Sequence, residues 1–248
     1  MEGILMSIAL NYQLSAFGKF SSTPTPTVIT DLMSKINQEA EEVFLPNIIN
    51  SQQIEIPSNK ITTISNLGFI TQTQRYSISI LNERIDINYN KADNLDVDIE
   101  SFYAFSVKTL SAIMSYFKLS SNRLAINIQR VCELDSFKAL HECGKKLVAS
   151  AAYYDGKEFA DWSMRTNSQV KVQLDKLQEV FNVITDISSV QDITGQKAAC
   201  LFHIDINTVP QNQSMRFSME TLPSFVRNAK SIATKLIDDV ERLIMDAK

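Results

Sequence analysis

Alternation of apolar and polar residues with a period of two recurs along this chain of 248 residues and constrains its fold most strongly. Residues 6–17, for example, place Ile8, Leu10 and Tyr12 on one face and polar residues between them. Successive side chains of a strand point to opposite faces, so this pattern is typical of half-buried strands. It returns in residues 54–90, 123–131, 162–174, 179–190 and 197–207. The sequence therefore predicts a protein rich in sheet.

Apolar residues spaced three and four apart predict helices between these strands. The expected helices cover residues 28–45, residues 99–117, a short segment around Phe137 and Leu147, and a long closing helix. Pro46 is expected to end the first of them. The closing helix is expected to start near Thr221, with Pro223 in its first turn.

The order of these elements predicts an α+β protein with antiparallel or mixed sheets and packed helices. The first half reads β-α-β-β-α-β, which is the ferredoxin-like order. We expect residues 1–131 and 132–248 to form two sheet-and-helix halves or one continuous domain. A hairpin turn is expected at residues 192–195.

Composition excludes several classes of function. The six glycines are isolated, whereas phosphate-binding loops need clustered glycines that let backbone N–H groups approach phosphate. Three scattered cysteines predict reduced thiols rather than a disulfide framework. The first residues lack the basic region of a signal peptide, and polar residues interrupt the apolar run too soon for a membrane span. We therefore expect a cytoplasmic location without membrane contact.

His203 and Asp205 are the weak candidates for catalysis. Strict alternation places them on one face of a strand, and a histidine beside a carboxylate can serve as a general base. Cys200, the nearest nucleophile, alternates onto the apolar face. No orienting or oxyanion element accompanies the pair, so no catalytic residue is assigned and an ordinary polar sheet face is favoured.

Metal-ligand spacing is absent from the sequence. His141 and Cys143 are two residues apart, so they point in different directions on a helix. Ligand pairs on a helix sit three or four residues apart. The acidic run at residues 93–100 fails as a calcium loop, since Ser101 and Val107 stand where an EF-hand needs Gly and Glu. We expect no metal and no cofactor.

Several segments together carry a resemblance. They are residues 84–89 (Arg-Ile-Asp-Ile-Asn-Tyr), an aromatic helix with Phe102 and Phe105, residues 122–127, and residues 202–207 before one closing helix. The chain resembles a sporadically distributed family of bacterial proteins of unknown function, about 250 residues long. The resemblance implies no activity and no catalytic residues. Patchy distribution suggests phage-defence, toxin–antitoxin or mobile-element contexts.

We therefore predict a non-enzymatic module for protein interaction or regulation, whose partner is another protein or a second copy of this chain. One alternative is a hydrolase or nuclease that holds a divalent ion with Asp86, Asp186 and Asp205, which lie on polar faces of predicted strands. A second alternative is nucleic-acid binding. It is not favoured, because the net charge is −4 and Lys145-Lys146 is the only adjacent basic pair.

Overall fold

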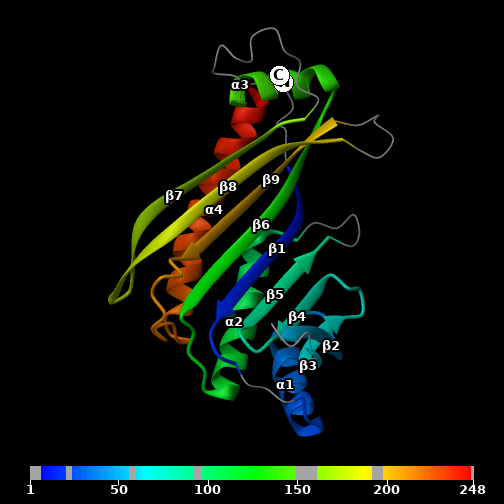
Figure 1. Cartoon of the computed structure of the whole chain (residues 1–248), viewed down its shortest axis with the longest axis vertical. Helices are drawn as coiled ribbons and strands as arrows, with labels where there is room; N and C mark the ends of the chain where they lie inside the picture. The colour runs from blue at the N-terminus through cyan, green and yellow to red at the C-terminus, as the bar shows by residue number, and fades with distance from the viewer. Residues whose placement is uncertain are drawn as a thin grey trace.

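One antiparallel sheet of nine strands dominates the computed structural model, which describes residues 7–20, 24–55, 60–91, 97–148, 161–191 and 198–246. The strands are β1 (Ile8–Phe17), β2 (Phe44–Glu55), β3 (Lys60–Thr71), β4 (Tyr76–Ile80), β5 (Arg84–Asn90), β6 (Arg123–Leu134), β7 (Ser163–Leu174), β8 (Leu177–Gln191) and β9 (Ala198–Thr208). The helices are α1 (Pro26–Glu39), α2 (Ile99–Phe117), α3 (Phe137–Val148) and α4 (Leu222–Met245). Across the sheet, the order is β2-β3-β4-β5-β1-β6-β9-β8-β7 (Figure 1).

The chain runs twice through a similar succession of elements. The first is β1-α1-β2-β3-β4-β5-α2, and the second is β6-α3-β7-β8-β9-α4. The leading strands, β1 and β6, pair antiparallel at the centre of the sheet, so the two units join edge to edge. The predicted division between residues 131 and 132 stays a prediction.

The expected ferredoxin-like order is wrong, because four strands and not two lie between α1 and α2. The periodicity extended the first helix to residue 45, whereas α1 ends at Glu39 and β2 begins at Phe44. Pro46 lies inside β2 instead of ending a helix. Because β2 is an edge strand, it has a hydrogen-bonded neighbour on one side only. A proline, which lacks the backbone N–H, is therefore tolerated there.

Other predicted elements are confirmed. The three strands of the second half correspond to β7, β8 and β9, and the long closing helix is α4, with Thr221 as its N-cap and Pro223 in its first turn. Asp98 caps α2 by accepting a hydrogen bond of 2.9 Å from the backbone N–H of Ser101. The expected turn at residues 192–195 and the first half of the acidic run at 93–100 lie outside the described residues.

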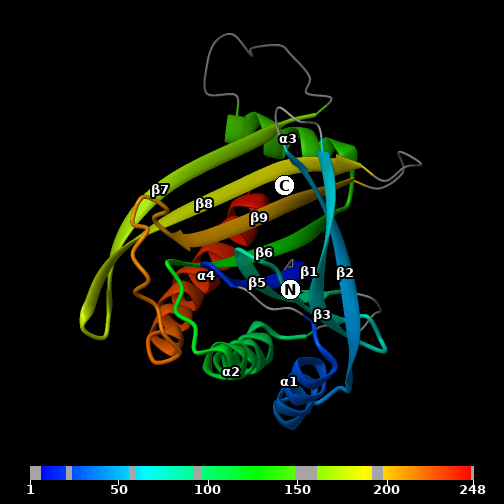
Figure 2. The same ribbon diagram turned by 60° about the horizontal axis from the view of Figure 1, so that its bottom comes forward.

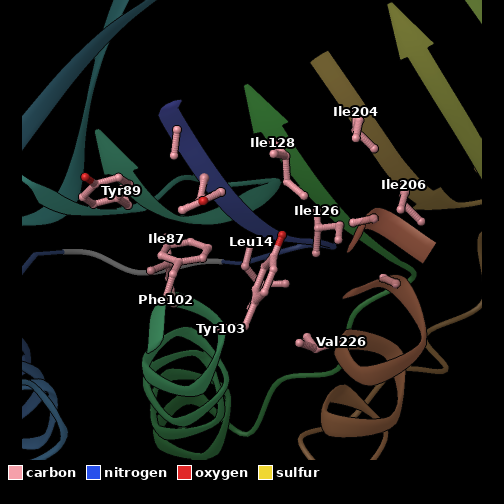
Figure 3. Close-up of a cluster of buried hydrophobic side chains, with 14 of the residues drawn as sticks. Leu14, Ile87, Tyr89, Phe102, Tyr103, Ile126, Ile128, Ile204, Ile206 and Val226 are labelled. Atoms are coloured by element: carbon pink, nitrogen blue, oxygen red, sulfur yellow. The ribbon is translucent and has the colours of Figure 1, made fainter. Parts of the chain in front are cut away.

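The hydrophobic core lies between the sheet and the helices, on one face of the sheet that we call the covered face. Figure 2 shows α1, α2 and α4 on the same side of the strands. Phe102 and Tyr103 of α2 point toward the sheet, and Val226 lies on the side of α4 that faces α2, as Figure 3 shows. The central strands contribute fully or almost fully buried residues: Tyr12, Leu14, Ile85, Ile87, Tyr89, Leu124, Ile126, Ile128, Phe202, Ile204 and Ile206.

A register shift in β1 corrects the predicted faces of its first residues. The pairing with β6 is irregular between Ala9 and Asn11, so Ala9 and not Leu10 joins Tyr12 in the core. Near this bulge the Tyr12 hydroxyl accepts a hydrogen bond of 2.8 Å from Arg130. The same guanidinium contacts Ser7, whose hydroxyl donates to Glu241 of α4. The bulged end of β1 is thereby tied to the closing helix.

Helix α3 brings the three cysteines together on the covered face. Cys132 and Cys200 are direct partners on β6 and β9, and all three thiols are free and buried. A hydrogen bond with Cys200 lowers the pKa of Cys143, while the same bond and burial raise the pKa of Cys200. Gly144 is required beside them, because a Cβ there would lie 2.6 Å from Trp162 Cδ1.

No helix among the described residues combines the length and the apolar character that crossing a membrane requires.

Candidate functional site

We call the opposite face of the sheet the open face. No described helix lies on it, because α1, α2 and α4 lie on the covered side (Figure 2) and α3 packs there through Cys143, which contacts Cys200. Its side chains are those that alternate with the core residues of each strand. Small amides and hydroxyls dominate its central strands: Asn11, Gln13 and Ser15 on β1, Ser77 and Ser79 on β4, Asn88 and Asn90 on β5, Asn127 and Gln129 on β6, and Asn207 on β9. Uncharged donors and acceptors therefore make up much of the open face on its central strands.

Four of these side chains and His203 form one hydrogen-bonded row across β9, β6, β1, β5 and β4, which we call the amide chain. His203 Nε2 lies 3.2 Å from Asn127 Oδ1 and donates to it, and Asn127 donates to Gln13 Oε1 at 3.1 Å. Gln13 donates to Asn88 Oδ1 at 2.8 Å, and Asn88 donates to Ser77 Oγ at 3.4 Å. All four bonds run in the same direction.

The amide chain leaves hydrogen-bonding capacity for a ligand. An amide carries two N–H donors and a carbonyl with two lone pairs, and each amide here spends one donor and one acceptor within the chain. Side chains that are already held by neighbours lose less conformational entropy when a ligand binds. With strands ~4.8 Å apart, the row spans ~19 Å, which corresponds to about six residues of extended polypeptide.

A hollow of about 380 Å³ opens at the β9 end of the amide chain and is lined by three of its members. Gln13, Asn127 and His203 form part of the lining, together with Gln129 and Asp186. Asp186 faces His203 across the β8–β9 pairing and forms an ion pair of 3.5 Å with Arg165 of β7. The hollow can therefore receive a polar group, with donors and acceptors on its walls.

His203, Asp205 and Cys200 lie where the alternation predicts, but they do not assemble a catalytic group. His203 and Asp205 share the open face, whereas Cys200 is fully buried on the covered face. His203 is bonded to Asn127, and Asp205 accepts a hydrogen bond of 2.9 Å from Asn207. Both His203 and Asp205 are therefore hydrogen-bonded to amide side chains and not to each other.

The three carboxylates of the predicted metal site do not converge. Asp86 lies on β5 and Asp205 on β9, three strand spacings or ~14 Å apart, while Asp186 lies on β8, one strand further. A pair of metal ions needs ligands around centres only ~4 Å apart. Within the described part of the chain, no three His, Cys, Asp or Glu side chains form a group that could hold a metal ion. His141 is half-buried on α3, while Cys143 is fully buried there beside Cys200.

Asp86 is the buried carboxylate of the open face. Ser15 donates a hydrogen bond of 2.6 Å to its Oδ1, and Arg84 Nε lies 2.7 Å from its Oδ2. Burial nevertheless raises the pKa of Asp86 above its ordinary value, against the opposing effects of Ser15 and Arg84. The folded protein therefore holds a proton on Asp86 more tightly than the unfolded chain does.

An Asp86→Asn substitution is expected to gain stability relative to the natural protein as the pH rises from about 4 to about 7. The raised pKa favours the folded state of the natural protein fully below the unfolded pKa, and this advantage is lost as the pH rises through the folded pKa. One proton limits the slope to about 1.4 kcal/mol per pH unit. Urea unfolding of both proteins over this pH range measures the difference in their free energies of unfolding. Asp239→Asn, on the exposed surface of α4, is the control. A difference that moves the opposite way with pH contradicts the raised pKa.

The amide chain was missed by sequence reasoning, although part of its signal is visible in the sequence. Asn11, Gln13, Asn127 and Gln129 occupy the polar positions of two alternating segments, where Lys, Glu or Thr would serve a merely solvated face equally well. What the sequence did not reveal was that these two segments pair with each other at the centre of the sheet.

Comparisons with family models, with curated proteins and with solved structures find no match to this chain. The resemblance to a sporadically distributed bacterial family therefore stays a prediction.

Proposed function

We propose that this protein is a non-enzymatic interaction module that binds an extended segment of a partner protein on its open face. The amide chain is the observation that carries the proposal. Asn and Gln side chains offer neutral donors and acceptors that match the N–H and C=O groups of a peptide backbone. Such a surface needs no metal, cofactor or nucleophile to act.

The absence of charge along the amide chain supports a protein partner rather than a nucleic acid at this part of the open face. Affinity for nucleic acids comes largely from Lys and Arg side chains that neutralise successive phosphates. The amide chain contains neither residue type, and Arg165, beside the hollow, is already paired with Asp186. A neutral ligand with hydrogen-bonding groups fits this surface better than a polyanion.

The test is a selection of random peptides of about twelve residues on the full chain, long enough to cover the ~19 Å of the amide chain. Binding of the selected peptides is then measured by fluorescence anisotropy with the natural protein and with the double variant Gln13→Ala/Asn127→Ala. Loss of two ligand-binding amides is expected to weaken binding at least tenfold, or about 1.4 kcal/mol. Gln38→Ala, which removes an exposed amide from α1, is the matched control and should leave the affinity unchanged.

The proposal fails when the selection gives no peptide whose binding depends on Gln13 and Asn127. It also fails when the double variant instead loses affinity for single-stranded or duplex DNA offered to the natural protein. That second result would make the open face a nucleic-acid surface.

A further inference from the structure

A second hollow, of about 800 Å³, lies at one end of the open face, and we call it the terminal pocket. It is built where β1, β5 and β6 meet the segment that follows β9. The residues that matter for its chemistry are Phe17, Lys19, Glu83, Arg84, Arg123 and Met215.

An aromatic ring flanked by two guanidinium groups forms the floor of the terminal pocket. Phe17 of β1 pairs with Arg84 of β5 on one side and with Arg123 of β6 on the other. The guanidinium carbon of Arg123 lies 4.6 Å from the centre of the ring, and that of Arg84 lies 5.8 Å from it. A guanidinium that stacks on a ring keeps the N–H groups at its edge available for bidentate contact with an oxyanion.

Arg123 differs from Arg84 in its polar contacts among the residues that the structure describes. Its Nε atom is buried and makes no hydrogen bond with any residue that the structure describes. The Nε atom of Arg84 is also buried without a hydrogen bond to a described residue, but it lies 2.7 Å from the carboxylate of Asp86 and is ion-paired with it. A buried donor without a partner costs free energy, so a ligand that supplies an acceptor there is favoured.

We propose that the terminal pocket binds a carboxylate side chain of the partner segment, held by Arg123 and Lys19 over the ring of Phe17. This proposal rests on the proposed function and names the chemistry of the partner: an Asp or Glu residue. Three positive groups, Lys19, Arg84 and Arg123, face two negative ones, Glu83 and Asp86, so one positive charge remains. That excess matches a single carboxylate.

The pocket and the amide chain lie on the same face of β1, four residues apart. Gln13 and Phe17 are therefore separated by ~14 Å, or about four residues of an extended chain. A peptide that meets the amide chain at Gln13 and then continues along β1 toward Phe17 should place its acidic residue about four positions beyond the residue that contacts Gln13. The amide chain itself adds no Lys or Arg toward a second anion, which favours an acidic peptide over a strand of phosphates.

The first test needs no partner and uses side-chain N–H signals of arginine in the full chain, observed by NMR. The probes are sodium N-acetylaspartate, inorganic phosphate and sodium chloride. N-acetylaspartate is expected to shift the Arg123 Nε–H signal saturably, while the signal of Arg227 on α4 stays in place; loss of a signal in Arg123→Lys assigns it. The proposal is overturned when the Arg123 signal does not shift with N-acetylaspartate, or when sodium chloride alone gives the same shift. Saturation by phosphate without saturation by the carboxylate also overturns it, since the pocket would then be a phosphate site.

The second test uses the selected peptides. Changing the Asp or Glu of these peptides to the corresponding amide should weaken binding to the natural protein about tenfold. The same change should leave binding to the Arg123→Gln variant unaltered. Peptides that depend on Gln13 and Asn127, but bind Arg123→Gln as tightly as the natural protein, overturn the carboxylate proposal and leave the proposed function standing. Failure to select peptides removes the proposed function alone, because the NMR titration still decides whether the pocket takes a carboxylate.

Discussion

Replacing Arg216 by Met is expected to lower the free energy of unfolding by about 3–5 kcal/mol, because it leaves a buried carboxylate without its partner. Arg216 holds Glu179 of β8 with two contacts, Nε to Oε1 at 2.6 Å and a second N–H to Oε2 at 3.2 Å. The two side chains are only 9% and 5% exposed. Water therefore cannot solvate the carboxylate of Glu179 once Arg216 is removed.

Arg216 also organises the segment between β9 and α4. Its guanidinium donates to the backbone oxygens of Asn122, Asn212 and Ser214 and lies 4.4 Å from the centre of the Phe217 ring. This segment carries Met215 to the wall of the terminal pocket. Loss of Arg216 is thus expected to disturb the pocket in the molecules that remain folded.

Urea unfolding followed by the fluorescence of Trp162, the single tryptophan, measures the effect. Lys145→Met is the matched control, because it breaks the exposed ion pair of 3.1 Å with Glu142 and should cost less than about 1 kcal/mol. The double variant Glu179→Met/Arg216→Met should be more stable than Arg216→Met, since no unpaired charge remains. Equal stability of the double and single variants would show that the buried charge is not the cause.

Local pattern predicted the elements well wherever the local signal was unambiguous. The alternation around His203 and Asp205 gave the correct strand and the correct faces, with Cys200 in the core. Pro46 was misread because a proline both ends a helix and fits an edge strand, and only the position of β2 in the sheet distinguishes the two.

The candidate site could not be predicted from local pattern because it is assembled across strands. Gln13 meets Asn88 and Asn127, residues that are 75 and 114 positions away in the chain. Three cysteines that are scattered in sequence meet on the covered face for the same reason. Alternation specifies which face a side chain occupies, whereas the order of strands decides which side chains share a row.

Replacing Phe102 by Ala is expected to cost about 3–5 kcal/mol, since it opens a cavity between α2 and the centre of the sheet. The ring is fully buried and points toward the sheet (Figure 3). Its centre lies 5.5 Å from that of Tyr12 and 5.1 Å from that of Tyr103. Phe117→Ala is the matched control on the same helix. Phe117 is only half-buried and its described ring contact is with the neighbouring Tyr116, so the loss should be no more than about half as large.

The comparison of Phe102→Ala with the open-face variants also tests whether stability and binding lie on opposite sides of one sheet. Urea unfolding gives the stability of each variant, and anisotropy with the selected peptides gives its affinity, corrected for the folded fraction. Phe102→Ala should lose stability and keep affinity, because Tyr12 and the backbone of β1 separate its ring from Gln13. Gln13→Ala/Asn127→Ala should do the reverse. A large loss of affinity in Phe102→Ala would mean that α2 sets the curvature of the sheet on which the amide chain depends.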